Sequence, residues 1–106
     1  MTRYSDKLIE ITDTEILFRA YYFPVGAKRV KWADAAGVTA HKPTLGNGRY
    51  KLWGGDGFTW LPLDAKRPGR TVMFSLSFPR SRRKINFTVE DSQVVKAVLG
   101  SLGVLR

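Results

Sequence analysis

The chain has 106 residues with 43% hydrophobic and 25% charged positions, enough for one folded domain with a single core. It contains no cysteine, which excludes disulfides and cysteine–zinc sites and favours a reducing, cytoplasmic setting. No stretch approaches the roughly 20 apolar residues of a membrane helix, and the first residues lack the apolar run of a signal peptide. We therefore expect a single cytoplasmic domain over residues 1–106.

The net charge of +9 is concentrated in one region of the chain. Seven basic and no acidic residues lie between Ala65 and Val89, whereas the remaining residues carry eleven basic and nine acidic side chains. A region of this kind attracts anions such as lipid head groups, nucleic acid or an acidic protein. The alternative is that these charges simply face water and keep the protein soluble.

The first two thirds of the chain read as short strands separated by turns. A short apolar run stands at 8–12, and apolar or alternating runs predict strands at 15–23, 28–32, 38–41, 49–53 and 58–63. Between the last two, GGDG (54–57) is typical of a hairpin turn, because Gly and Asp tolerate positive φ. The run 15–23 has apolar residues on both faces, so this strand is either buried on both sides or meets a partner, which favours an oligomer.

The last third contains the clearest pattern. Residues 71–78 place Val72, Phe74, Leu76 and Phe78 on one face, with Met73 as the exception on the polar face. In 84–90, Ile85, Phe87 and Val89 point inward, and Lys84, Asn86, Thr88 and Glu90 point outward. We predict two half-buried antiparallel strands joined by a turn at PRSRR.

The period then changes from that of a strand to that of a helix. One apolar stripe combines Val94, Val95, Val98, Leu99 and Leu102. Asp91 or Ser92 suits the N-cap and Gly103 the C-terminal stop. Gly100 interrupts the helix and suggests close packing on the sheet.

Six to seven strands followed by one terminal helix resemble the pleckstrin-homology-like (PH-like) fold. The segments ILFRAYYFP, WGGDGFTWLPLD and FTVED are similar to small bacterial PH-like proteins of uncharacterised function. The resemblance implies a mainly β chain: an antiparallel PH-like β-sandwich or partial barrel closed by one C-terminal α-helix. It also implies a binding role, because such domains often hold lipid head groups at their open end.

Two basic clusters are the candidate anion-binding residues. The early cluster is Lys28, Arg29 and Lys31, and the late cluster is Arg80, Arg82, Arg83 and Lys84. Arginine offers a planar fork for phosphate oxygens, and lysine offers a mobile point charge. The early cluster matches the family's basic-x-Arg pattern only in part, because KRVK lacks the expected Arg.

The sequence gives little support to catalysis, a metal site or a cofactor. His41 is the only histidine, and a zinc site built on it would need several carboxylates. The three tryptophans, Trp32, Trp53 and Trp60, lie in strand-like runs beside apolar neighbours, which favours core positions over base stacking.

We therefore expect a non-enzymatic binding or adaptor domain that contacts an anionic membrane surface or an acidic protein, with peripheral membrane association as one form of that contact. Non-specific nucleic-acid binding ranks below this, because the aromatic motifs of RNA-binding sheets are missing. A structural homo-oligomerisation module is the remaining alternative.

Overall fold

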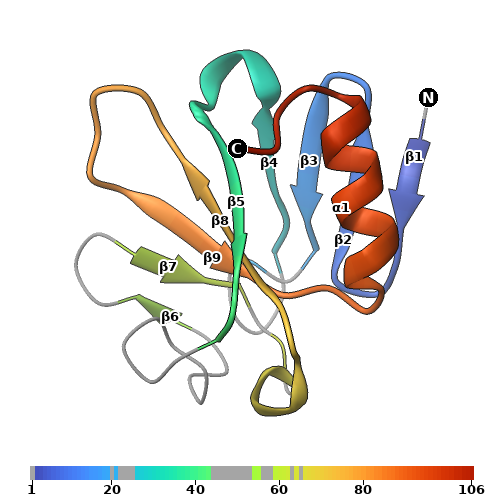
Figure 1. Cartoon of the computed structure of the whole chain (residues 1–106). Helices are drawn as coiled ribbons and strands as arrows, with labels where there is room; N and C mark the ends of the chain where they lie inside the picture. The colour runs from blue at the N-terminus through green and yellow to red at the C-terminus, as the bar shows by residue number, and fades with distance from the viewer. Residues whose placement is uncertain are drawn as a thin grey trace.

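The computed structural model describes residues 2–19, 21, 26–43, 54–55, 59–62, 64 and 66–106, which form two β-sheets and one α-helix (Figure 1). The first sheet has the order β1-β2-β3-β4, with bounds Thr2–Ser5, Ile9–Thr12, Glu15–Phe18 and Lys28–Lys31. The second has the order β5-β8-β9-β7-β6, with bounds Gly37–His41, Met73–Ser77, Lys84–Phe87, Thr59–Leu61 and Gly54–Gly55. Short 3-10 helices, η1 and η2, span Trp32–Asp34 and Arg67–Gly69, and α1 spans Ser92–Ser101. The predicted mainly β chain with a C-terminal helix is confirmed.

The strands differ from the prediction in number and in one pairing. The described residues hold nine strands instead of six to seven, because β1 lacks an apolar pattern and β6 has only two residues. The expectation of antiparallel pairing throughout is wrong at one place, because β7 runs parallel to β9. The antiparallel β6–β7 pair agrees with the predicted hairpin, but Gly54 and Gly55, which were expected to belong to the turn, form β6 instead. Residues 56–58 and the predicted strand 49–53 lie outside the described residues.

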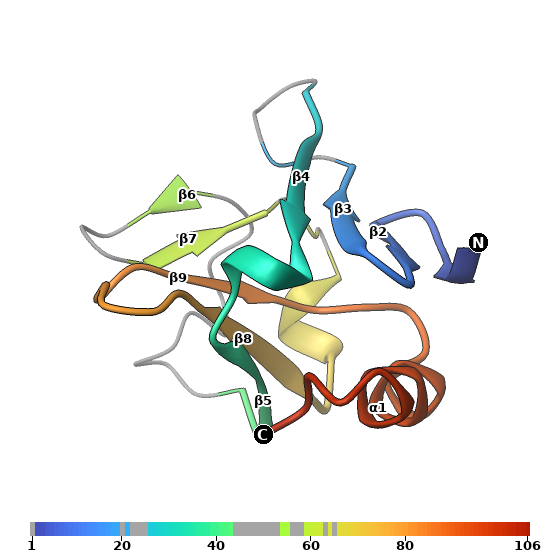
Figure 2. The same cartoon turned by 90° about the horizontal axis from the view of Figure 1, so that it is seen from above.

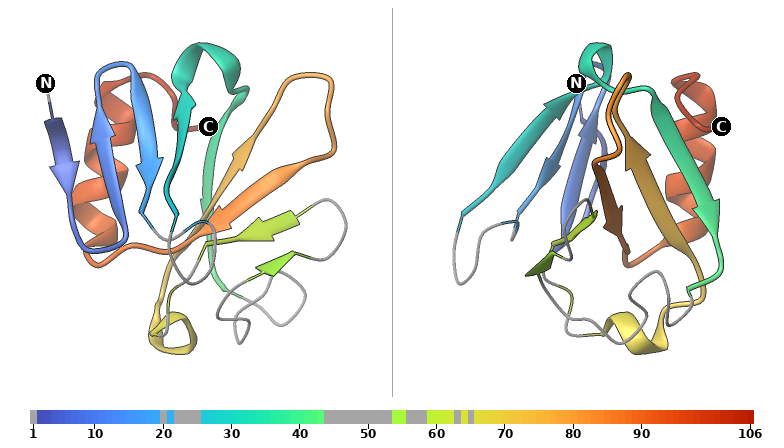
Figure 3. Two further views of the ribbon diagram at one scale, coloured as in Figure 1. Left: turned by 180° about the vertical axis from the view of Figure 1, so that it is seen from behind. Right: turned by 90° about the vertical axis from the view of Figure 1, so that its left-hand side faces the viewer.

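The core lies between the two sheets, which face one another in the right-hand view of Figure 3. Phe18 from the first sheet meets Phe87 from the second edge to face, with ring centroids 5.1 Å apart. Phe87 also stacks on Phe74 at 5.5 Å. Each of these rings is almost fully buried, and burial of an aromatic side chain contributes roughly 2–3 kcal/mol. The alternating strands of both sheets thus form one continuous core.

Helix α1 lies beside the edges β1 and β5, as Figure 2 shows. Its buried residues are Val95 and Leu99, in agreement with the predicted stripe. The N-cap is Asp91, whose side chain accepts from Val94 N at 3.2 Å. The prediction that Val94 shares this stripe is wrong: its side chain is 44% exposed, whereas that of the adjacent Val95 is fully buried.

Two glycines of the helix have different roles. Gly103 has a φ of 75° and ends the helix as predicted. The expectation that Gly100 permits close packing is wrong, because it is exposed and a Cβ built there meets no atom within 4 Å.

The outer face of the second sheet is more buried than its polar sequence indicates. Asn86 and Thr88 were expected to point outward into water, yet both are buried, and Met73 is completely buried. Thr88 Oγ1 donates to the carboxylate of Asp64, which is also buried. The segment that leads into η2 therefore covers this end of the face and supplies hydrogen-bond partners that alternation alone does not reveal.

Strand β3 is buried on both faces within one chain. Ile16 and Phe18 point into the core, while Leu17 points outward between its cross-strand neighbours Glu10 and Arg29. Leu17 is nevertheless only 9% exposed, because the apolar stems of long charged side chains cover surface apolar groups. The described part of this strand thus needs no partner subunit to account for its apolar composition.

Candidate anion-binding surface

The late basic cluster forms the tip of the β8–β9 hairpin, as the PRSRR turn predicted. The last paired residues are Ser77 and Lys84, and residues 78–83 make the connection at the upper left of Figure 1. Ser81 Oγ accepts from Arg83 N at 3.1 Å, which closes a local turn. Arg80 adopts a φ of 58°, a conformation uncommon for a residue with a side chain.

All four basic side chains of the tip are exposed: Arg80, Arg82, Arg83 and Lys84. None of them forms an ion pair with the part of the chain that the structure describes. The acidic residues of the described ion pairs are Asp13, Glu10, Glu15 and Asp64, all engaged by other arginines. The tip therefore presents four positive charges whose field its own neighbours do not neutralise.

The early cluster occupies β4 and is partly satisfied within the fold. Arg29 Nη1 lies 3.4 Å from Glu15 Oε1. Lys28 Nζ lies 5.3 Å from the centroid of the Tyr21 ring, a cation–π distance. Lys31 is exposed and makes no ion pair among the described residues. Among the described residues, Lys31 is thus the one cation of the early cluster that forms neither an ion pair nor a cation–π contact.

The two clusters do not form one patch. Strand β4 belongs to the first sheet, and the β8–β9 tip projects from the second. Figures 1 and 2 both show the tip pointing away from β4.

The acid-free region between Ala65 and Val89 also divides in two. Lys66, Arg67 and Arg70 lie at or beside η2, whereas the other four basic residues lie at the tip. Figure 1 places η2 and the tip at opposite ends of the molecule. The regional charge in the sequence is thus two separate groups in space.

The η2 group is organised around the buried carboxylate of Asp64. Arg70 Nε donates to Asp64 Oδ2 at 3.0 Å and Arg70 Nη2 to Oδ1 at 3.3 Å. Burial raises the pKa of Asp64, but the hydrogen bonds from Arg70, Thr88 and Lys66 N outweigh it and hold the pKa below its usual value. Sequence reasoning missed this network, and the signal for it was a lone Asp directly before the acid-free region.

Arg67 is the most buried cation of the η2 group. Its side chain is almost completely inside, and Nη2 donates to Pro62 O. Burial lowers the pKa of the guanidinium to about 10, against the opposing charge of Asp64. At neutral pH Arg67 is still charged, so it stabilises the segment before η2 and offers no surface for a ligand.

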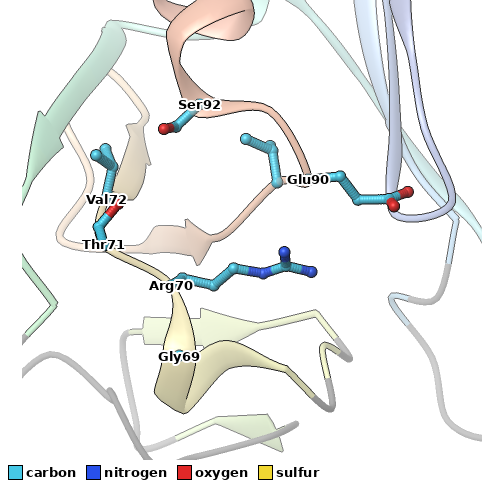
Figure 4. Close-up of a pocket in the computed structure, with 7 residues that line it drawn as sticks. Gly69, Arg70, Thr71, Val72, Glu90 and Ser92 are labelled. Carbon is cyan, nitrogen blue, oxygen red and sulfur yellow. The ribbon is translucent and has the colours of Figure 1, made fainter.

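A small pocket of about 170 Å³ lies between η2 and the start of α1 (Figure 4). Its lining residues are Gly69, Arg70, Thr71, Val72, Val89, Glu90 and Ser92. The cation of this lining, Arg70, is already paired with Asp64, and Glu90 adds a negative charge. The pocket is therefore a poor site for an anion.

His41 lies at the end of β5 and takes part in a polar chain. Its Nε2 lies 2.7 Å from Ser75 Oγ, and Ser75 Oγ donates to Asn86 Oδ1 at 2.7 Å. Within the described residues, no three histidine, cysteine or acidic side chains gather in a way that could hold a metal ion.

Trp32 and Trp60 both donate to backbone carbonyls. The acceptors are Thr12 O at 3.1 Å and Tyr21 O at 3.0 Å, and Trp60 also stacks on the Tyr21 ring. Both rings are half-buried and join segments of the fold, and Trp32 packs against the core. Trp53 lies outside the described residues.

The chain was compared with known proteins. No family model matches it, and no curated protein and no solved structure matches it either. Among the described residues, the helices are all too short or too polar to cross a membrane.

Proposed function

We propose that this chain is a non-enzymatic binding domain of PH-like architecture, a β-sandwich closed by its C-terminal helix, whose β8–β9 tip contacts an anionic surface. The supporting observation is the exposed tip, where four basic residues make no ion pair with any described carboxylate. Elsewhere on the described surface, Arg3, Arg19, Arg29 and Arg70 each pair with a carboxylate, and Arg106 bonds to backbone carbonyl groups. The arginines of the tip form no ion pair with any described carboxylate.

The shape of the tip favours a surface over a small ligand. It is a convex hairpin end, and the pocket described above lies near η2 at the other end of the molecule. Each basic residue near an anionic membrane contributes about 1 kcal/mol, so four contribute about 4 kcal/mol. That free energy corresponds to a dissociation constant of about a millimolar. The contact is therefore weak, dependent on salt and suited to an adaptor that has a second point of attachment.

The experiment is sedimentation with vesicles of acidic phospholipid at low salt. The tip variant is Arg82→Glu with Arg83→Glu. A matched control, Lys7→Glu with Lys66→Glu, makes the same change in net charge at exposed positions away from the tip. We expect the wild-type chain and the control to sediment with acidic but not with neutral vesicles, and the tip variant to stay in solution.

Two outcomes would overturn the proposal. Equal losses for the tip variant and the control would show that net charge alone governs binding. An absence of sedimentation combined with tip-dependent retardation of RNA would replace the membrane with nucleic acid, and the salt slope would then count the phosphates contacted.

A further inference from the structure

Strand β4 is the outer strand of the first sheet, and its far edge is open among the described residues. The hydrogen bond from Trp32 N to Thr14 O, 2.9 Å long, shows which residues of β4 direct their backbone groups toward β3. In an antiparallel pair the backbone groups of successive residues point alternately toward and away from the partner strand. Val30 and Lys28 therefore bond to β3, and the N–H and C=O groups of Arg29 and Lys31 point away from it.

The pairing of β3 with β2 leads independently to the same assignment of backbone directions. Arg19 N donates to Leu8 O at 3.0 Å, so the backbone groups of Leu17 and Glu15 face β2. These are the residues opposite Arg29 and Lys31 in the register of β3 and β4. The described residues supply no backbone hydrogen bond to Arg29 or Lys31 on the open side.

The open edge is strongly basic. Three of the four residues of β4 are cations, and the side chains of Arg29 and Lys31 are both exposed. The Arg29–Glu15 pair is a surface contact in which the arginine side chain is 65% exposed, and such pairs are weak. The backbone groups and the charges available for a partner therefore belong to the same two residues.

The charges decide which kind of strand fits this edge. A second copy of the chain, paired edge to edge through β4, would place cations opposite cations, which is destabilising. A strand with carboxylates at alternate positions would place them opposite Arg29 and Lys31 and would satisfy the open backbone groups at the same time.

We propose that the β4 edge binds an extended acidic segment of a partner protein by strand addition. The partner's backbone pairs with Arg29 and Lys31, and its carboxylates, two residues apart, face these two side chains. This site is separate from the β8–β9 tip, so either can fail without the other.

The probe is a synthetic peptide, acetyl-TEVEVET-amide, added to the ¹⁵N-labelled full chain. Amide hydrogen exchange is measured residue by residue with and without peptide. We expect exchange at the Arg29 and Lys31 amides to slow by about fivefold or more at saturation, because these N–H groups become hydrogen-bonded. The amides of the tip residues are expected to be unchanged.

Two controls separate strand addition from charge attraction alone. The same peptide with N-methylated pairing positions keeps its carboxylates but loses its backbone donors, and it should give no slowing. The variant Arg29→Gln with Lys31→Gln should lose the effect, whereas Arg82→Glu with Arg83→Glu should keep it. The spectrum of each variant reports whether it is folded.

Equal slowing with the N-methylated peptide, or shifts confined to the tip, would overturn the proposal. So would slowing at Arg29 and Lys31 that grows with protein concentration in the absence of peptide, because a second copy would then occupy the edge.

Discussion

Arg70 holds Asp64 with two hydrogen bonds at a position where the carboxylate is almost completely buried. The side chain of Asp64 is 3% exposed and that of Arg70 is 19% exposed. The two distances, 3.0 and 3.3 Å, describe a two-pronged contact of guanidinium with carboxylate. Thr88 of the chain after β9 and Lys66 N complete the shell around the same carboxylate, so the pair connects η2 to the second sheet.

The change Asp64→Asn tests this network. We expect it to lower the free energy of unfolding by about 2–3 kcal/mol at neutral pH, because it removes one partner of a buried pair. Urea denaturation measures the loss. Glu15→Gln is the matched control, since it breaks the surface pair with Arg29 and should cost under about 1 kcal/mol.

The low pKa of Asp64 adds a pH dependence to this prediction. Because the folded pKa lies below the ordinary value of 3.8, the stabilisation is complete above that pH and is lost as the pH falls through the folded pKa. The difference in free energy of unfolding between the wild-type chain and Asp64→Asn should therefore shrink below about pH 4. A difference that stays constant at lower pH would contradict the lowered pKa of Asp64.

Asp6 joins the β1–β2 turn to the start of α1. Its Oδ1 accepts from Leu8 N at 2.7 Å and Ile9 N at 2.8 Å, and its Oδ2 accepts from Glu90 N at 2.9 Å. We expect Asp6→Ala to lower the free energy of unfolding by about 2–3 kcal/mol, because several hydrogen bonds to a charged group are lost together. Asp13→Ala, which removes only an exposed pair with Arg3, is the control in the same urea experiment. Equal effects of the two changes would show that the hydrogen bonds of Asp6 stabilise the fold no more than the exposed ion pair of Asp13 does.

Tyr4 belongs to the same hydrogen-bond network as Asp6. We therefore expect the stability of the chain to change at alkaline pH. Its hydroxyl donates to Asp6 Oδ2 at 2.5 Å and accepts from Asp91 N at 3.1 Å. Burial, and then the hydrogen bond to Asp6, raise the pKa of Tyr4 well above 10.0. Folding therefore favours the neutral phenol, and this stabilisation is lost as the pH rises above the unfolded value.

The measurement is urea unfolding of the wild-type chain and of Tyr4→Phe at increasing pH. The advantage of the wild-type chain should shrink above about pH 10. Tyrosinate absorbance should show one of the four tyrosines ionising later than the others. Normal ionisation of Tyr4 in the folded chain would contradict this account.

Gly37 begins β5, where the C-terminal residues cover the edge of the second sheet. Val38 N donates to Val104 O at 2.9 Å, and Arg106 N donates to Val38 O at 2.7 Å. Gly37 has a φ of 149°, and a Cβ there would lie 2.6 Å from Arg106 Cγ. We expect Gly37→Ala to lower the free energy of unfolding by about 1–3 kcal/mol through backbone strain and this clash.

The double variant Gly37→Ala with Arg106→Ala separates the two causes. It should recover the part of the loss that comes from the clash and keep the part that comes from φ, as a thermal-melting cycle measures. Full stability of Gly37→Ala alone would contradict both.

The alternating patterns predicted β8, β9, the turn between them and the capped helix, because each depends on local periodicity and short-range capping. The burial of Met73, Asn86 and Thr88 could not be predicted in this way. Thr88 is buried with a hydrogen bond to Asp64 of the segment before η2, and alternation describes only which face a side chain occupies. The parallel pairing of β7 with β9 was unpredictable for a related reason: it joins strands that are not neighbours in the chain.

The basic residues show the same limit at the site. Counting charges predicted an anion-binding region from Ala65 to Val89, and the tip keeps that role as a proposal. Arg67 and Arg70 turned out to serve the fold instead, through Pro62 O and Asp64. A one-dimensional count cannot separate these groups, because β8 and the residues that flank it separate the η2 group from the tip in space.

The most direct test of the central claim measures which end of the molecule meets an anionic surface. Because the chain contains no cysteine, Ser81→Cys and Thr71→Cys each give one labelling position, at the tip and near η2. Both positions are exposed. Energy transfer from the attached dye to acceptor lipids in acidic vesicles should be stronger from position 81 and should vanish at high salt. Equal transfer from both positions, or stronger transfer from position 71, would contradict the assignment of the β8–β9 tip as the contact.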